Sequence, residues 1–273
     1  MVATPIGNLM DMTFRAVEVL KTVDLIAAED TRNTQKLLNH FDIHTPMMSY
    51  HDHNRMKAGE QLLGKLGEGL SIAIVTDAGT PIVSDPGYEL IRDAWQMGHT
   101  VIPVPGACAG ITALMGAGLN AEQFYFAGFL PREKGDRDAE LSRLKELPAT
   151  IIFYEAPHRI QKTLAAIYAA FGDREGCLCR ELTKKFETFQ RGKLSILISY
   201  FDTNEPRGEY VVLIEGRGDI EAESVSEDTI RSYAREAFQN GGRMKEVARS
   251  LSERFDLSRN DAYRIAQEEK DAI

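Results

Sequence analysis

Residues 70–87, LSIAIVTDAGTPIVSDPG, decide the fold of this chain. Residues 72–75 are a short apolar run between charged and glycine-containing segments, which predicts a strand buried on both faces of a parallel sheet. A loop of small residues follows at 77–81. Asp85 and Pro86 then predict the start of a helix over 88–97, as its N-cap and first residue. This order places the loop at the carboxyl end of a parallel strand, where open α/β sheets bind ligands.

The composition of the 77–81 loop narrows the class of ligand. Ala78 and Gly79 leave bare backbone against which a ligand can lie. Asp77 and Thr80 offer hydrogen bonds to hydroxyls, amines or an adenine edge. Neither a P-loop nor the dinucleotide fingerprint G-x-G-x-x-G occurs in this stretch. The loop therefore predicts a nucleoside-sized pocket without a phosphate cradle, and a plain surface turn is the alternative.

Composition limits the class of protein. A chain of 273 residues, 43% of them hydrophobic, can bury the core of one large or two modest domains. The net charge of −9 argues against a protein that coats nucleic acid electrostatically, although a local basic face remains possible. The sequence shows no long apolar span and no secretory leader, so we expect no membrane association. Cys108, Cys177 and Cys179 predict reduced thiols in the cytoplasm, with Cys177 and Cys179 facing one side of a strand.

Strands and helices alternate over most of the chain, which predicts an α/β fold. We expect two α/β domains, residues 1–118 and 119–220, and a charged loop at 131–138. Residues 2–7 are interpreted as the end of a first strand. The other expected strands cover 25–28, 100–105, 124–130, 150–154, 178–182 and 209–216, and the expected helices include 13–23, 33–41 and 160–171.

Polar or small residues follow several of these strands. Glu29, Asp30 and Arg32 form either a site or the capped start of a helix, and the sequence favours neither interpretation. Residues 105–109 open a helix with very small side chains, which admits a flat ligand or the close packing of another backbone. His51 and His53 form a single His-x-His pair, which is more typical of a solvated loop than of a metal site. We therefore predict no metal.

The end of the chain is purely helical in pattern. Residues 221–227 predict an acidic linker, and helices are expected over 228–238, 244–255 and 259–270. The last two resemble a helix-turn-helix. Residues 224–273 contain nine basic and ten acidic residues. The candidate members of a basic face for nucleic acid are Arg231, Arg235, Arg243, Lys245, Arg249, Arg259 and Arg264. A small packing bundle or dimer-supporting bundle is the alternative.

Seven motifs occur together and in order along the chain. They are TPIGNL, AEDTR, DAGTPIVSDPG, PVPGACA, FYEAPHR, RELTKKFE and GEYVVLIEG. As a set they resemble the tetrapyrrole methylase family, and in particular its branch that methylates the ribose 2′-hydroxyl of a cytidine in small-subunit (16S) ribosomal RNA. The resemblance implies a cytoplasmic, homodimeric enzyme that uses S-adenosylmethionine, with a cofactor cleft between two α/β domains and a small C-terminal helical domain. The RNA partner could be free or part of the assembled subunit.

The resemblance also implies roles for individual residues. The cofactor-binding residues are Pro5, Gly7, Asp77, Ala78, Gly79, Thr80, Ile82, Val83, Pro105, Gly106, Ala107, Cys108, Ala109, Tyr154, Glu155, Ala156 and Glu209. The candidates for deprotonating the ribose hydroxyl are Glu29, Asp30, Glu155, His158 and Lys184. Arg32, Arg159, Arg259 and Arg264 are the candidate RNA contacts. No metal is needed, because the cofactor already carries an activated methyl group.

Two other functions are compatible with parts of the sequence. A small-molecule tetrapyrrole methylase would share the cofactor cleft but has no use for a helical tail with basic side chains. A DNA-binding regulator whose α/β body senses a nucleoside would use the tail and the pocket, and would leave the FYEAPHR and RELTKKFE motifs without a role.

Overall fold

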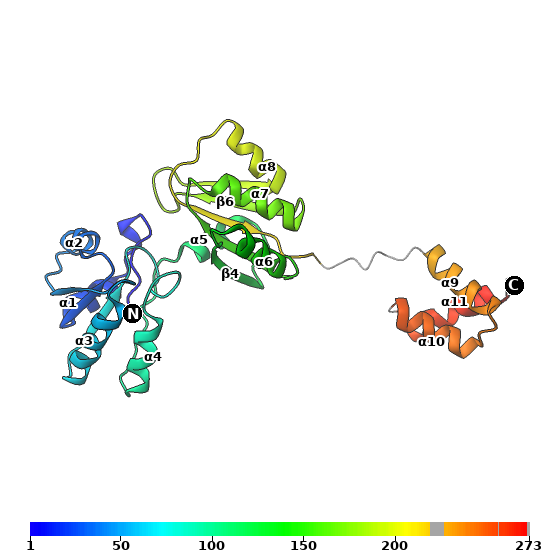
Figure 1. Ribbon diagram of the computed structural model, residues 1–273, viewed down its shortest axis with the longest axis horizontal. Helices are drawn as coiled ribbons and strands as arrows, with labels where there is room; N and C mark the ends of the chain where they lie inside the picture. Colours follow the sequence, from blue (N-terminus) through cyan, green and yellow to red (C-terminus); the bar gives the residue numbers. More distant parts are fainter. Residues whose placement is uncertain (219–226, 256, 272–273) are drawn as a thin grey trace. The chain divides into compact units, whose positions relative to one another are not determined.

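The computed structural model describes residues 1–218, 227–255 and 257–271. The chain divides into two compact units, Met1–Gly216 and Arg217–Ile273 (Figure 1). The expected acidic linker at 221–227 lies, except for Glu227, outside the described residues. The expected boundary near residue 118 falls inside the first unit, between the strands of two separate sheets. The division into domains 1–118 and 119–220 therefore stays a prediction.

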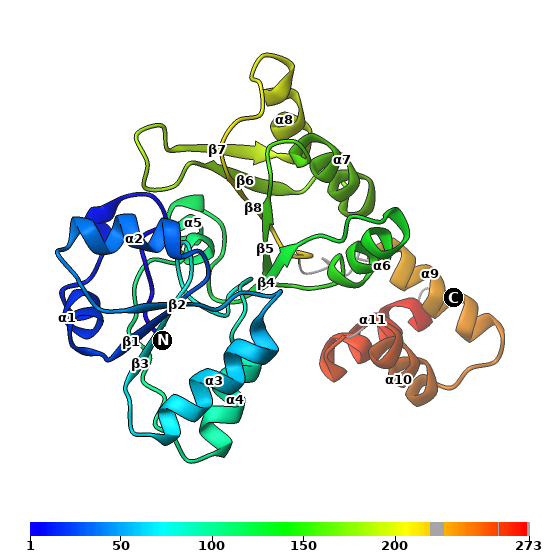
Figure 2. The same cartoon turned by 60° about the vertical axis from the view of Figure 1, so that its left-hand side comes forward.

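The first sheet is parallel, as the 72–75 segment predicts. It consists of β1 (Leu25–Ala28), β2 (Met47–Ser49) and β3 (Ile72–Val75) in the order β2-β1-β3. Its alternating side chains pack against helices on both faces (Figure 2). One face lies against α1 (Phe14–Thr22) and α2 (Thr31–His40), and the other against α3 (Arg55–Gly67) and α4 (Tyr88–Gln96). Both faces of β1 are consequently buried.

The edge of this sheet differs from the sequence-based expectation. Residues 2–7 and 100–105 form no strand with each other, and only Val2 and Val104 make a parallel bridge. The Val2 N–H donates to the Ile74 carbonyl at 2.9 Å, which joins this bridge to β3. Pro103 and Pro105 have no N–H to donate to a ladder, which accounts for the missing strand at 100–105.

Two further expectations about local structure are wrong. Helix α4 begins at Tyr88 with Gly87 as its N-cap at φ 137°, so Asp85 and Pro86 belong to the preceding loop. The expected loop at 131–138 becomes helical at Lys134, where α6 (Lys134–Leu144) begins. An ion pair between Lys134 and Asp138, one turn apart at 2.5 Å, supports this first turn.

The second sheet is mixed and has five strands. They are β4 (Phe124–Phe129), β5 (Thr150–Glu155), β6 (Glu175–Arg180), β7 (Thr188–Lys193) and β8 (Tyr210–Ile214), in the order β4-β5-β8-β6-β7. Strands β4 and β5 are parallel, and the other neighbours are antiparallel. Strand β7 and the following helix α8 (Leu194–Ser199) were not expected from the sequence. Two 3-10 turns, η1 (Leu9–Asp11) and η2 (Tyr200–Asp202), complete the elements of this unit.

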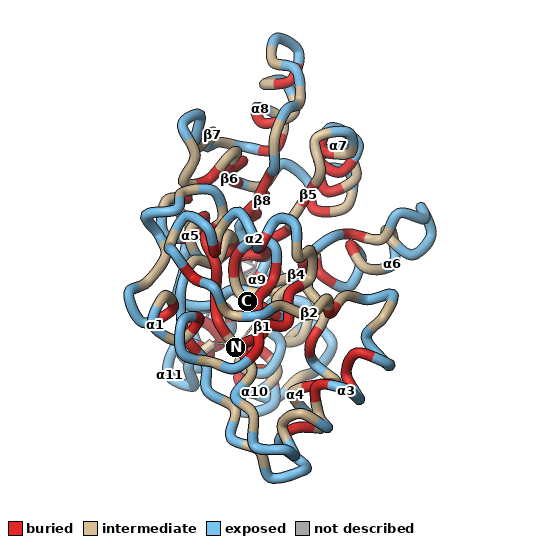
Figure 3. The backbone as a smooth tube through the Cα atoms, turned by 90° about the vertical axis from the view of Figure 1, so that its left-hand side faces the viewer, coloured by how far each residue is buried: buried red, intermediate tan, exposed pale blue. Residues whose placement is uncertain are grey.

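The period-two alternation of this sheet separates two cores. Its central strands β5, β6 and β8 are largely buried (red in Figure 3). Phe153 and Val212 pack on the face covered by α6, α7 (Ile160–Phe171) and α8. Leu213 packs on the opposite face, against α5 (Ala109–Ala117). Cys177 and Cys179 both face α5 with their Sγ atoms 3.7 Å apart, which confirms that they share one side of the strand.

The second unit contains the three expected helices, α9 (Glu227–Gln239), α10 (Met244–Phe255) and α11 (Arg259–Asp271). They enclose a small core that includes Ala234, Leu251 and Ile265. Ser258 caps α11, because its Oγ accepts the Asp261 N–H at 3.1 Å.

Candidate active site

A cavity of about 520 Å³ lies at the strand ends of the first unit. Glu29 and Thr76 contribute to it just beyond the carboxyl ends of β1 and β3. Glu155 lines it at the carboxyl end of β5, and the antiparallel β8 brings Glu209 to the same edge of the second sheet. The cavity therefore occupies the position where α/β sheets bind ligands.

Eleven of the expected cofactor-binding residues line this cavity. They are Asp77, Ala78, Gly79, Thr80, Val83, Cys108, Ala109, Tyr154, Glu155, Ala156 and Glu209. The structure thus brings residues of the small-residue segments 77–81 and 105–109 to one cavity. Seven lining residues other than Glu29 were missed, namely Ile6, Thr76, Ser84, Asp85, Phe129, Pro157 and Leu182, whereas Tyr210 and Val211 belong to the 208–211 segment from which the resemblance implies further cofactor contacts. Asp85 could have been found, because its motif offered a carboxylate beside the predicted loop.

The other expected cofactor-binding residues do not line the cavity. They are Pro5, Gly7, Ile82, Pro105, Gly106 and Ala107. A Cβ on Gly106 would lie 2.9 Å from the Ala3 Cβ, and one on Gly7 would lie 2.5 Å from the Lys184 Cγ. These two glycines therefore permit chain packing. Ala107 has a supporting role, because its carbonyl accepts the Thr80 hydroxyl at 3.0 Å and ties the 77–81 loop to the start of α5.

Two loops that border the cavity hold residues in the left-handed region. Ile82 has φ 76° and Ser84 has φ 68° on one loop, while Glu181 has φ 52° and Thr183 has φ 66° on the other. A β-branched residue such as Ile82 rarely adopts this conformation, and such strain concentrates at ligand sites. Residues in this uncommon conformation therefore lie on two loops that flank the cavity.

Carboxylates make the wall of the cavity acidic. Glu29 Oε2 accepts the Thr76 hydroxyl at 2.8 Å. Asp77 accepts the Asp30 N–H at 3.1 Å and the Asn33 side-chain amide at 3.2 Å, which joins the end of β3 to the start of α2. Burial, together with the nearby charges of Glu29 and Asp77, raises the pKa of Asp85 to about 6, and a hydrogen bond with Thr76 partly opposes the shift. This electrostatic environment favours a cationic ligand.

The Glu155 carboxylate is engaged by hydrogen bonds and an ion pair with neighbouring residues. Its side chain is buried and accepts the Ala156 N–H at 2.8 Å and the Thr163 hydroxyl at 2.5 Å. Arg159 lies 3.3 Å from Glu155 and donates to the Leu130 carbonyl at 2.7 Å. With these partners, Glu155 and Arg159 fix the loop after β5 that forms one side of the cavity.

Asp30 is the N-cap of α2. Of the two interpretations of this segment, the capped start of a helix is therefore correct for Asp30, and the helix begins at Thr31 instead of residue 33. Asp30 accepts the Arg32 N–H at 2.8 Å and also accepts hydrogen bonds from Nε and Nη2 of the Arg32 guanidinium at 3.1 and 2.7 Å. Hydrogen bonds from the Arg32 side chain lower the pKa of Asp30 to about 2, which makes it a weak base. The Arg32 side chain itself is 87% exposed.

The remaining two catalytic candidates do not line the cavity. His158 is exposed to solvent. Lys184 lies 2.8 Å from Glu209 and 3.1 Å from Glu181. Burial lowers the pKa of Lys184, but the hydrogen bonds with Glu209 and Glu181 outweigh that effect and raise it. Lys184 thus remains charged beside a carboxylate that does line the cavity.

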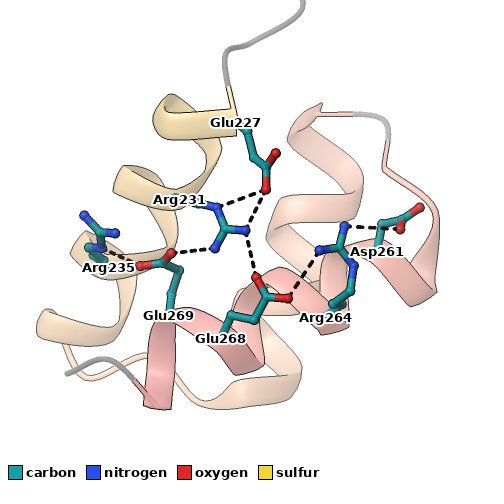
Figure 4. A network of polar contacts seen from close by, with 7 residues as sticks. All are labelled: Glu227, Arg231, Arg235, Asp261, Arg264, Glu268 and Glu269. Carbon is teal, nitrogen blue, oxygen red and sulfur yellow. Dashed lines mark hydrogen bonds and ion pairs between the residues drawn. The ribbon is translucent and has the colours of Figure 1, made fainter.

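In the second unit, three of the expected basic residues are neutralised by neighbouring carboxylates (Figure 4). Arg231 pairs with Glu227, Glu268 and Glu269, and Arg235 also pairs with Glu269. Arg264 lies 3.3 Å from Glu268 and 3.6 Å from Asp261. The expected face of seven basic residues is therefore not uniformly basic, because Arg231 and Arg235 join α9 to α11 and Arg264 pairs with carboxylates of its own helix.

The described residues contain neither a candidate metal-binding cluster nor a candidate membrane-spanning helix. No cluster of three or more His, Cys, Asp or Glu side chains in residues 1–218, 227–255 and 257–271 has a geometry suited to a metal ion. Within the same ranges, no helix has the length and apolar character needed to span a membrane.

Comparison with known proteins places these features in a family. The model of the Tetrapyrrole (Corrin/Porphyrin) Methylases matches residues 1–197. Proteins named Ribosomal RNA small subunit methyltransferase I are 47% identical in Synechocystis sp. (98% of this chain, 96% of the relative) and 45% identical in Halalkalibacterium halodurans (98% and 94%). The expectation of S-adenosylmethionine as methyl donor is confirmed at the level of this family.

Solved structures share the fold at low identity. A diphthine synthase superposes with a TM-score of 0.62 and 13% identity over 79% of this chain and 88% of that chain. A cobalt precorrin-4 methyltransferase gives 0.59 and 16% over 78% and 92%. The α/β fold class expected from the sequence is confirmed. The family model covers the cavity-lining segments up to Leu182, and the relatives match nearly the full chain. This chain therefore belongs to the tetrapyrrole methylase family.

Proposed function

We propose that this protein transfers a methyl group from S-adenosylmethionine to the ribose 2′-hydroxyl of a cytidine in small-subunit ribosomal RNA. The observation that carries the proposal is the identity of 45–47% over 98% of the chain with proteins named for methylating small-subunit ribosomal RNA. The cytoplasm, where ribosomal RNA is found in bacteria, is the proposed site of action.

The residues of the cavity fit S-adenosylmethionine. The cavity volume of about 520 Å³ lies within the range of volumes found for cofactor sites. The backbone at Ala78 and Gly79 provides a flat wall, and Leu182, Val211 and Phe129 provide apolar surface. Glu29, Asp77 and Asp85 supply negative charge opposite a ligand that carries a sulfonium and an ammonium group. When bound, the cofactor supplies an activated methyl group, so that the protein needs no metal to generate an electrophile.

The chain's own residues then have two tasks. They must hold the ribose oxygen in line with the reacting carbon at near-attack distance, and they must accept a proton from the hydroxyl. Glu29 is the best-placed base among the five candidates, because it lines the cavity and, among the described residues, its carboxylate accepts hydrogen bonds only from the Thr76 hydroxyl at 2.8 Å and the Asp77 N–H at 3.5 Å. Asp30, Glu155 and Lys184 are each engaged in contacts that position the loops. Arg32, largely exposed, is a proposed phosphate contact.

Transfer of a tritiated methyl group tests this proposal. The wild-type protein should label small ribosomal subunits or their naked RNA, and nuclease digestion should yield 2′-O-methylcytidine. Comparison of the two substrates decides between free RNA and the assembled subunit. Labelling of a porphyrinoid with no labelling of RNA would identify a small-molecule methylase. Tight binding of duplex DNA without methyl transfer to any substrate would identify a regulator.

Asp85 should control cofactor affinity in a pH-dependent manner. Its carboxylate form attracts the cationic cofactor, and with a pKa of about 6 that form is lost as the pH falls below 6. We therefore expect the wild-type affinity to be constant from pH 8 to 7 and to decline by up to about tenfold per unit below pH 6. Asp85→Asn should bind more weakly at pH 7.5 with a flatter pH profile, as measured by calorimetry. An unchanged affinity and profile would contradict this role.

A homodimer is proposed because the first unit exposes large apolar side chains. Met10 is 90%, Phe14 is 95% and Met115 is 84% exposed. Exposed apolar residues of this kind are typical of surfaces that contact another protein chain. We expect light scattering to give the mass of a dimer and Phe14→Glu to shift the population towards monomer. Lys21→Glu, an exposed change on the same helix, is the control. A wild-type monomer at micromolar concentration would contradict the proposal.

A further inference from the structure

The second unit contains a groove between α10 and α11 that is separate from the ion-pair network of Figure 4. It has a volume of about 480 Å³, and its principal side chains are Lys245, Arg249, Glu253, Arg259 and Tyr263. Lys245 and Arg249 are four residues apart on α10, and Arg259 and Tyr263 are four residues apart on α11. Each pair therefore lies on one helix face. Two helix faces thus converge on one concave surface.

The charge of this groove differs from that of the network. Its lining contains three cations and one carboxylate. Arg249 pairs with Glu253 at 2.7 Å, whereas neither Lys245 nor Arg259 forms an ion pair with another residue of the described ranges. In the network, by contrast, Arg231 alone contacts three glutamates. The uncompensated positive charge of the groove is thus suited to an anionic ligand.

An aromatic ring lies beside these cations. The Tyr263 side chain lines the groove and the residue is 44% exposed. An exposed ring next to lysine and arginine side chains matches the way proteins hold unpaired nucleotides, with bases stacked on aromatic rings and phosphates bound by cations. A duplex would present only its phosphates to such a groove, because its bases are stacked internally.

We infer that the α10–α11 groove is a docking site for a single-stranded segment of RNA, in which Lys245 and Arg259 bind backbone phosphates and Tyr263 stacks on a base. The inference rests on the proposed function for the identity of the RNA. It narrows the seven basic residues expected from the sequence to the two that line the groove and form no ion pair within the described ranges. Arg264, an expected RNA contact, instead pairs with Asp261 and Glu268 of its own helix.

Charge reversal in the full-length protein tests the groove. The probe is a transcript of small-subunit ribosomal RNA, and the dissociation constant is measured by filter binding over a range of salt concentrations. Lys245→Glu and Arg259→Glu should each weaken binding about tenfold or more, because hydrogen bonds to charged groups typically contribute about 1.5–3 kcal/mol. Each should also flatten the salt dependence by about 0.7 to 0.9 in the logarithmic slope. Tyr263→Ala should weaken binding and leave the slope unchanged.

Lys270→Glu is the matched control, because Lys270 is exposed on α11 and does not line the groove. It should retain wild-type affinity for the same net change of charge. If Lys245→Glu or Arg259→Glu fails to fold, the charge-neutralising variant Lys245→Gln or Arg259→Gln is measured in its place. All variants should keep normal affinity for S-adenosylmethionine. Affinities and slopes equal to the wild type in the groove variants would overturn the inference. It would also be overturned if the wild-type protein bound duplex DNA as tightly as the RNA and the groove variants lost affinity for both to the same extent.

Failure of the docking site and failure of the proposed function are distinguishable. If the wild-type protein methylates small subunits and the groove variants bind RNA normally, only the docking site is wrong. If the wild-type protein binds RNA through the groove and transfers no methyl group to any ribosomal substrate, the proposed reaction is wrong.

Discussion

Replacement of Ala78 by leucine should reduce the affinity for S-adenosylmethionine by at least about a hundredfold. The Ala78 side chain lines the cavity, and Ala78 does not have the positive φ found at Gly79. The longer side chain can therefore enter the cavity without straining the loop. Filling a preformed site with extra methylenes costs about 1–3 kcal/mol, and the cofactor must also be displaced from the wall it contacts.

This variant is a better test than substitution of the neighbouring glycines. Gly79 has φ 87°, and a Cβ on Gly106 would collide with Ala3, so leucine at either position would disturb the fold itself. Calorimetry measures the affinity, and the melting temperature should stay close to the wild type. Ala165→Leu, an exposed substitution on α7 outside the cavity, provides the matched control and should bind normally. Normal binding by Ala78→Leu would mean that the cofactor binds elsewhere.

Replacement of Glu29 by glutamine should lower the turnover number about a hundredfold while the affinity for S-adenosylmethionine changes only a few-fold. General acid–base groups typically contribute a factor of about 100 to 10,000. Glutamine retains the shape of the side chain and can still interact with Thr76, so the loss isolates the proton-accepting role. Single-turnover methyl transfer at saturating RNA measures the effect.

Asp30→Ala separates catalysis from helix capping. Asp30 caps α2 and pairs with Arg32, so its replacement should lower the melting temperature and leave turnover within a few-fold of the wild type. If Glu29→Gln also remains within a few-fold, Glu29 is not the base. If the turnover numbers of all five alanine variants, at Glu29, Asp30, Glu155, His158 and Lys184, stay within a few-fold of the wild type, positioning of the substrates alone accounts for the reaction.

Local sequence determined the elements whose signals are short in range. The apolar run at 72–75 forms a buried parallel strand, and the caps and periodicity at 228–270 give three helices with nearly the expected bounds. The seven motifs indicated the family that the family model and the relatives then showed. Small residues of the 77–81 loop and of the 105–109 helix start were expected at the cofactor site, and residues from both segments line one cavity. Each of these inferences depends on residues that are close together in the sequence or on a recognised motif.

Only the tertiary structure decided how side chains with the same local pattern divide their roles. Asp85 looks like an N-cap in sequence, but the loop carries it into the cavity, where burial raises its pKa. Glu155 ends a buried strand, Glu29 follows one, and both line the cavity, yet only Glu155 is also engaged by Thr163 and Arg159. Arg231 and Arg249 each pair with a glutamate four residues away, and of the two only Arg231 also meets Glu268 and Glu269 on another helix. Burial and contacts between packed elements decide these differences, and a local sequence pattern does not encode them.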